Sequence, residues 1–183
     1  MHNPPMTSAL LIIDVQHGMC AGEYVAHDAE RVIERINTVS AKARAAGVPV
    51  VFIQHDEDDG PLRLDSPGWQ LATGLNVQAA DLRVRKRTSS SFHDTNLHAL
   101  LRERGVKRVV ACGLQSEYCV DSTVRSAVQH GYDVTLVSDA HSTFDNAVLS
   151  AAQISAHENA TLNGFGCGDK RVNLSAAADV AFD

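Results

Sequence analysis

The sequence predicts a single α/β domain spanning residues 1–183, built as a three-layer, doubly wound and mostly parallel sheet of about six strands. Three observations lead to this prediction. Continuous apolar runs, of which residues 9–13 (ALLII) are the first, are typical of strands that are buried on both faces. Segments with apolar residues at helical spacing alternate with these runs, and glycine or proline separates several of them. Such alternation favours a parallel sheet with right-handed crossovers and with helices on both faces.

The first strand, helix and strand occupy the chain up to residue 53. The apolar run at residues 9–13 ends at Asp14. Between residues 28 and 46, apolar side chains recur at helical spacing, and Gly47 followed by Pro49 ends that pattern. Residues 48–53 are then expected to form a second buried strand. Residues 56–74 are irregular, and a loop of this length in a compact domain usually serves a function.

The rest of the chain continues the alternation. The expected strands lie at residues 82–84 (leading to Lys86), 106–112, 133–137 and, more weakly, 171–174, and the expected helices lie at residues 96–104, 117–130 and 146–162.

Composition narrows the class of function. The chain is 44% hydrophobic, which is ordinary for a globular protein, and 183 residues are enough to bury roughly 70% of the unfolded surface. A formal net charge of −6 argues against binding to nucleic acid or to an anionic membrane surface. The four cysteines show no regular spacing and no leader segment is evident, so we expect a cytoplasmic protein with reduced thiols and small-molecule partners.

Three chemically reactive residues are expected at the carboxyl ends of strands. Asp14 follows the first strand, Lys86 follows the third, and Cys119 lies beyond the turn that begins at Gly113. Doubly wound sheets bind ligands beyond the carboxyl ends of their strands, where the strand order reverses. The pattern therefore predicts that these three side chains point toward one crevice.

Cys119 is the expected nucleophile. Its place at the start of the expected helix at residues 117–130 would favour the thiolate over the thiol, because unpaired N–H groups and the helix dipole are positive there. The alternative is that a lone cysteine is buried and inert, which is the more common case. We assign Cys112, inside an apolar strand, and Cys20 and Cys167, in glycine-containing loops, to packing or to chance.

Asp14 and Lys86 could each also have a role that is not catalytic. Asp14 could simply cap its strand, and Lys86 could be solvated charge within the run at residues 85–87 (RKR). Placed near the thiol, however, a partly buried carboxylate gains a pKa suited to a base. A lysine between that carboxylate and Cys119 would steady both anions.

Other reactive residues give weaker signals. Residues 55–58 (HDED) include metal-ligand types, but contiguous spacing cannot place all four on one ion, so we predict a solvated acidic loop and no metal. The serines at residues 89–91 lack a flanking histidine and carboxylate. Gly113 lacks the partner glycines of a dinucleotide-binding motif.

Several motifs in a fixed order resemble a known family. The chain resembles the isochorismatase-like cysteine hydrolases, which include nicotinamidases, from residue 10 to about residue 182. The segments that carry the resemblance are LIIDVQ at residues 11–16, KRT and SF at 86–88 and 91–92, GLQSEYCVDST at 113–123, GYDV at 131–134 and SDA at 138–140.

The resemblance implies the roles of several residues. The family's catalytic triad falls on Asp14, Lys86 and Cys119. Its cis peptide bond would join Leu114 to Gln115, and its oxyanion-binding amides would be those of Gln115 and Cys119. No cofactor is implied.

The chain departs from parts of the family pattern. Ser116 stands where the family usually has threonine, and this difference leaves a hydroxyl group at the position. Metal-dependent nicotinamidases carry an aspartate, a tryptophan and a histidine-proline pair where residues 54–57 here read QHDE, which argues against both a metal and nicotinamide. Residues 60–70 and 115–123 look more like the nicotinamidase-related branch that includes streptothricin hydrolase.

The predicted activity is hydrolysis of a C–N amide, imide or lactam bond of a small molecule through a thioester on Cys119. Asp14 would accept the thiol proton and later donate it to the leaving nitrogen. Two alternatives remain open: hydrolysis of a vinyl ether, as in isochorismatases, and a non-catalytic small-molecule binder of the same fold.

The walls of the substrate pocket and the assembly are expected from position and from the resemblance. We expect the rim to be formed by Gln16, His55, Trp69, Tyr118 and Phe144, although Trp69 could instead anchor its own loop. The resemblance implies a homodimer or larger homo-oligomer, in which a neighbouring subunit could complete the pocket.

Overall fold

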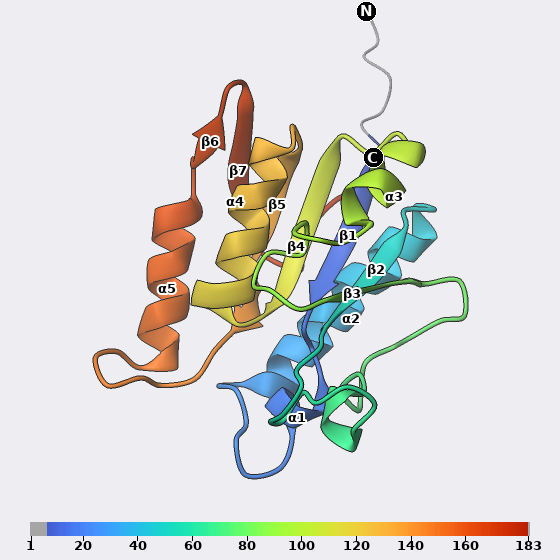
Figure 1. Ribbon diagram of the computed structural model, residues 1–183. Coiled ribbons are helices and arrows are strands. Elements are labelled where there is room, and N and C mark those ends of the chain that lie inside the picture. Colours follow the sequence, from blue (N-terminus) through green and yellow to red (C-terminus); the bar gives the residue numbers. More distant parts are fainter. Residues whose placement is uncertain (1–6, 183) are drawn as a thin grey trace, which may run out of the picture.

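One seven-stranded sheet runs through the computed structural model, which describes residues 7–182 (Figure 1). Its strands are β1 (Ser8–Ile13), β2 (Val50–His55), β3 (Leu82–Lys86), β4 (Arg108–Leu114), β5 (Asp133–Ser142), β6 (Gly166–Cys167) and β7 (Lys170–Ser175). The spatial order is β3-β2-β1-β4-β5-β7-β6, and all neighbours are parallel except β6 and β7. The predicted fold class is confirmed, and the strand beyond the expected six is the two-residue β6.

Helices cover both faces of this sheet (Figure 1). The helices are α1 (His17–Cys20), α2 (Ala29–Ala45), α3 (Leu97–Glu103), α4 (Asp121–Gln129) and α5 (Ala151–Leu162). Side chains of α3, α4 and α5 join one apolar core, whereas α2 joins the core on the opposite face. None of the helices within residues 7–182 is long and apolar enough to cross a membrane.

Strand β1 shows why its sequence is apolar throughout. Ala9, Leu11 and Ile13 lie in the core beneath α3 and α4, and Leu10 and Ile12 lie in the core beneath α2. Successive side chains of a strand point to opposite faces, so a central strand of a three-layer fold needs apolar residues at every position.

Several expected boundaries were wrong. Strand β5 continues to Ser142 instead of ending at residue 137, and α5 begins at Ala151 instead of residue 146. The Ser150 side chain caps that helix by accepting from the backbone N–H of Gln153. The Gln153 side chain in turn accepts from the backbone N–H of Ser150. The expected helix at residues 117–130 is divided into a π-helical turn, Ser116–Val120, and α4. The four-residue α1 and a 3-10 turn at Pro67–Trp69 were not expected.

The strand order reverses between β1 and β4. From β1 the chain builds outward to β2 and β3 on one side, and β4 then begins the other side. The carboxyl ends of β1 and β4 meet in register, with Ile13 beside Gly113. This is the position at which a doubly wound sheet leaves space for a ligand.

Candidate active site

Asp14 lies where β1 ends at this switch point. Its backbone adopts a φ of 50°, and its N–H donates to the carbonyl of Ile53, at 3.0 Å. The residue is 1% exposed, and its Oδ2 lies 2.6 Å from the Lys86 Nζ. Apart from this ion pair, the two carboxylate oxygens have no hydrogen-bond partner among residues 7–182. Burial raises the pKa of the Asp14 carboxyl above its ordinary value, against the opposing effect of the Lys86 charge.

Lys86, the last residue of β3, carries an ammonium that several groups share. Its Nζ lies 2.6 Å from Asp14 Oδ2, 3.0 Å from His55 Nδ1, 3.0 Å from the Thr88 carbonyl oxygen and 3.2 Å from Cys119 Sγ. Lys86 is 2% exposed, so these contacts are little screened by solvent. The ammonium therefore contacts both the carboxylate and the sulfur.

Cys119 lies in the π-helical turn between β4 and α4 and is partly buried. Burial, and next the charge of Asp14, raise the pKa of the thiol to about 12, while Lys86 acts in the opposite direction. The expectation that the helix terminus favours the thiolate is therefore wrong for the resting site. The dipole of a terminus is outweighed here by desolvation and by a carboxylate close to the sulfur.

The approach of β4 to β1 requires glycine at position 113. Gly113 has a φ of +125°, and a Cβ on it would lie 2.0 Å from the Ile13 carbonyl oxygen. A side chain would push the two strands apart just before the turn. The second peptide bond after this glycine, Leu114–Gln115, is cis, at the position that the family resemblance implies.

A cavity of about 230 Å³ opens beside these groups. It is lined by Asp14, Met19, His55, Glu57, Leu62, Ser89, Gln115, Tyr118 and Cys119. The cavity thus has the carboxylate, the sulfur and both residues whose amides are expected to bind an oxyanion in its wall. No lysine or arginine of the described part of the chain lines it.

His55 is held in this wall from two sides. Its backbone N–H donates to Gln16 Oε1 at 2.8 Å, and Gln16 Nε2 donates to its carbonyl at 3.1 Å. An ammonium can only donate, so the His55 Nδ1 accepts from Lys86 and the ring proton of the neutral imidazole lies on Nε2. Burial and then the Lys86 charge lower the pKa of His55, which favours this neutral form.

Of the five expected rim residues, two line the cavity, namely His55 and Tyr118, whose side chain is 55% exposed at the mouth. Gln16 is fully buried and supports His55 from behind. Trp69 donates its indole N–H to Asp56 Oδ1 at 2.6 Å, so it anchors its loop. Phe144 packs against a small apolar cluster.

Four lining residues were not expected at the site: Met19, Glu57, Leu62 and Ser89. Glu57 and Ser89 lie two and three residues beyond the ends of β2 and β3, so their distance from a strand end was an available signal. Met19 belongs to α1, which is too short to leave a periodic pattern.

Asp14, His55 and Cys119 have ligand-type atoms within 4.8 Å of one another. The Lys86 Nζ lies within 3.2 Å of an atom of each. An ammonium, and not an open coordination position, thus lies among the three groups. The neighbouring acidic residue Asp58 pairs with Arg87.

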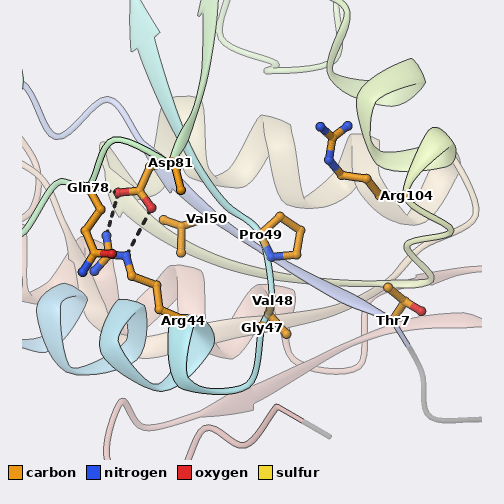
Figure 2. A pocket seen from close by; sticks show the side chains of 10 residues that line it. Thr7, Arg44, Gly47, Val48, Pro49, Val50, Gln78, Asp81 and Arg104 are labelled. Atoms are coloured by element: carbon orange, nitrogen blue, oxygen red, sulfur yellow. Dashed lines mark hydrogen bonds and ion pairs between the residues drawn. The ribbon is translucent and has the colours of Figure 1, made fainter.

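A larger hollow of about 570 Å³ lies at the other end of the sheet, around the start of β2 (Figure 2). Two of the three charged residues that line it neutralise each other, because the guanidinium of Arg44 binds both carboxylate oxygens of Asp81, at 3.1 and 2.8 Å. Among residues 7–182, neither cysteine nor histidine lines it. The smaller cavity, in contrast, is lined by Asp14, His55 and Cys119.

Comparisons with known proteins identify the family of the chain. Residues 8–162 match the isochorismatase domain family. The chain is 36% identical over 179 residues to a streptothricin hydrolase of Streptomyces noursei, covering 95% of this chain and 64% of that protein. It is 27% identical over 173 residues to the ureidoacrylate amidohydrolase RutB of Caulobacter vibrioides, covering 74% of this chain and 77% of that protein.

The fold is also found among solved structures. The crystal structure of an isochorismatase from Pseudomonas putida KT2440 superposes with a TM-score of 0.86 at 29% identity, covering 98% of this chain and 94% of that one. The chain spans less than two thirds of the length of the streptothricin hydrolases that it matches.

Proposed function

This chain belongs to the isochorismatase family of hydrolases, and from that premise we propose that it hydrolyses a C–N amide, imide or lactam bond of a small molecule with Cys119 as nucleophile. The observation that carries the proposal is the contact of one buried ammonium with both Asp14 Oδ2, at 2.6 Å, and Cys119 Sγ, at 3.2 Å, at the wall of a cavity. Relatives that are named as a streptothricin hydrolase and an amidohydrolase support the choice of bond.

The first step transfers the thiol proton as the sulfur attacks. Because the pKa values of both Asp14 and Cys119 are raised, the resting thiol is neutral and the carboxylate is a stronger base than an exposed one. The S–C bond forms, the proton moves to Asp14, and the carbonyl electron pair moves to the oxygen. Negative charge thereby moves from the carboxylate toward the substrate while Lys86 stays beside it.

The oxyanion is bound by the backbone N–H groups of Gln115 and Cys119 in this scheme. Its collapse breaks the C–N bond, and the leaving nitrogen takes the proton back from Asp14. Asp14 then takes a proton from water as the water oxygen attacks the thioester carbon. The C–S bond breaks, the sulfur takes that proton back from Asp14, and the carboxylic acid leaves with the thiol and the carboxylate restored. The scheme uses only side chains, backbone and water.

The lining of the cavity narrows the substrate class. A cavity of about 230 Å³ fits a small acyl group, and its ionisable lining groups are Asp14, His55, Glu57, Tyr118 and Cys119. The Lys86 ammonium is already engaged by Asp14, His55 and Cys119. Within residues 7–182 no lysine or arginine lines the cavity itself, so a substrate carboxylate would find no free cation there and would face Glu57. Neutral or cationic amides are therefore the proposed substrates, with the His55 Nε2–H available to donate to an acceptor on them.

The proposal is tested by incubating the wild-type protein with a panel of small neutral, cationic and anionic amides and following amine release. We expect turnover of a neutral or cationic member and an acyl adduct on Cys119 by intact-protein mass spectrometry after acid quench. Vinyl ether hydrolysis proceeds without such an adduct. Turnover by the Cys119→Ala variant, or turnover without any trapped acyl group, would exclude this mechanism.

A further inference from the structure

A second group of polar side chains lies behind the turn that carries Cys119. Ser116 opens this turn and is fully buried. Its Oγ lies 2.8 Å from His141 Nδ1 and 3.0 Å from Ser155 Oγ, which belongs to α5. One hydroxyl therefore connects the turn to both β5 and α5.

His141 extends the connection beyond the turn. It is 5% exposed and lies beside Gly113 in the β4–β5 register. Its Nε2 lies 3.1 Å from Asn159 Oδ1, and the Asn159 amide donates to the Ser138 carbonyl at 2.9 Å. These contacts join the two ends of the network to a strand and a helix that are themselves packed together.

The hydrogen bonds of this network run in one direction. The Asn159 NH₂ group donates to Ser138, so Oδ1 faces His141 and can only accept. The ring proton of His141 therefore lies on Nε2, and Nδ1 accepts from the Ser116 hydroxyl. The remaining donor, the Ser155 hydroxyl, is then directed at Ser116 Oγ. Burial lowers the pKa of His141, which keeps the ring neutral as the network requires.

Serine, histidine and asparagine are also the residue types of a hydrolytic triad, but a nucleophilic role does not fit. Ser116 is fully buried, and none of the network residues lines the cavity. A hydroxyl that no substrate can reach cannot attack one. The network acts instead on the position of the turn.

Resting on the proposed function, we infer that Ser116 and His141 are positioning residues: their hydrogen bond fixes the turn so that Cys119 stays within reach of Lys86 and Asp14. Few other side chains tie the turn to the sheet. Thr143 donates to Glu117 Oε1 at 2.9 Å, and Lys86 contacts Cys119. Small shifts of a nucleophile can cost up to a hundredfold in rate, so loss of the Ser116 bond acts on catalysis through geometry.

The test breaks this bond from either side. We expect Ser116→Ala and His141→Gln each to lower kcat about tenfold with little change in KM. Ser116→Thr keeps the hydroxyl and should retain the wild-type kcat. The double variant should be no slower than the slower single variant, because both remove one interaction. The matched control is Ser126→Ala, which removes a serine of α4 whose Oγ lies 3.5 Å from Nδ1 of another histidine, His130, just after that helix.

A second readout needs no substrate. The rate of Cys119 alkylation by iodoacetamide, measured against pH, depends on the contact with Lys86. We expect its midpoint to move to higher pH in Ser116→Ala and His141→Gln, and to stay unchanged in Ser116→Thr and Ser126→Ala. Wild-type kcat and an unchanged alkylation profile in a folded Ser116→Ala protein would overturn the inference. If Ser116→Ala does not fold, the same two measurements on His141→Gln decide. If the wild type hydrolyses no amide while the alkylation profiles still differ, the proposed function fails and the positioning role stands.

Discussion

Cys112 and Cys119 lie seven positions apart, one inside β4 and one in the turn that follows it. Burial raises the pKa of both thiols. Cys112 is fully buried, and its sulfur is 3.5 Å from the Leu11 carbonyl oxygen. Cys119 has a carboxylate and an ammonium beside it and a cavity in front of it. Cys119 therefore differs from Cys112 in having a base that can accept its proton, a cation in contact with its sulfur, and a cavity that a substrate can enter.

The comparison is tested most strongly by removing each sulfur. We expect Cys119→Ala to lose at least about 10³-fold in kcat, because the nucleophile is gone. Cys112→Ala should stay within about twofold of wild type, because Cys112 is fully buried and does not line the cavity beside Cys119. Steady-state amide hydrolysis measures both, and a large loss of kcat in a stable Cys112→Ala protein would contradict the distinction.

The base can be removed while the sulfur stays. Asp14→Asn should lower kcat about 10²- to 10⁴-fold, since no group remains to take the thiol proton. The same change removes a negative charge that raises the thiol pKa, so the midpoint of Cys119 alkylation should fall below about 12. A slower enzyme with a more acidic thiol is the expected signature. The alkylation is best measured with Cys167→Ser as background, because Cys167 is exposed.

The pH dependence of wild-type activity shows whether Asp14 sets the difference between the two thiols. Asp14 must be ionised to accept the proton, and burial raises its pKa above the ordinary 3.8. We therefore expect kcat/KM to fall as the pH is lowered, with an apparent pKa clearly above 3.8. A rate that stays constant down to that pH would mean that another group accepts the proton.

The smallest expected effect concerns stability. Cys112→Ala should lower the free energy of unfolding by about 1 kcal/mol, because it leaves a small gap in a packed strand. Cys167→Ala should change it by less than about 0.5 kcal/mol, since that residue is exposed. Urea denaturation followed by circular dichroism measures both variants. Equal stability of the two would show that Cys112 contributes nothing to packing.

Much of the fold was predictable because the signals were local. The apolar run of β1 and the periodicity of α2 follow from burial on two faces and on one. The extension of β5 was missed because Ser138 and Asp139 interrupt its apolar pattern, yet the strand continues beyond a register shift to pair His141 with Gly113. The start of α5 was misplaced although Ser150 and Gln153 carry the signature of a capping box.

Some features of the candidate site were likewise predictable from the sequence, and others were not. Strand ends predicted that Asp14, Lys86 and Cys119 would approach one another, because parallel strands end at one edge of the sheet. The raised thiol pKa was not predictable, because it depends on burial and on a carboxylate 105 positions away in the chain. The Ser116–His141 contact, between residues 25 positions apart, likewise follows from tertiary packing.

The surroundings of Lys86 have a consequence for how charge can move in this site. An ammonium has three hydrogens, and the Lys86 Nζ faces four acceptor atoms: an oxygen of Asp14, an oxygen of Thr88, a nitrogen of His55 and the sulfur of Cys119. Three hydrogens cannot each point at a separate one of four acceptors, so a slight rotation about the Cε–Nζ bond lets the ammonium follow the negative charge between the Asp14 oxygen and the Cys119 sulfur, which carries it when the thioester C–S bond breaks. The heavy atoms need not move, and the electrostatic reorganisation that a solvent would require is largely avoided.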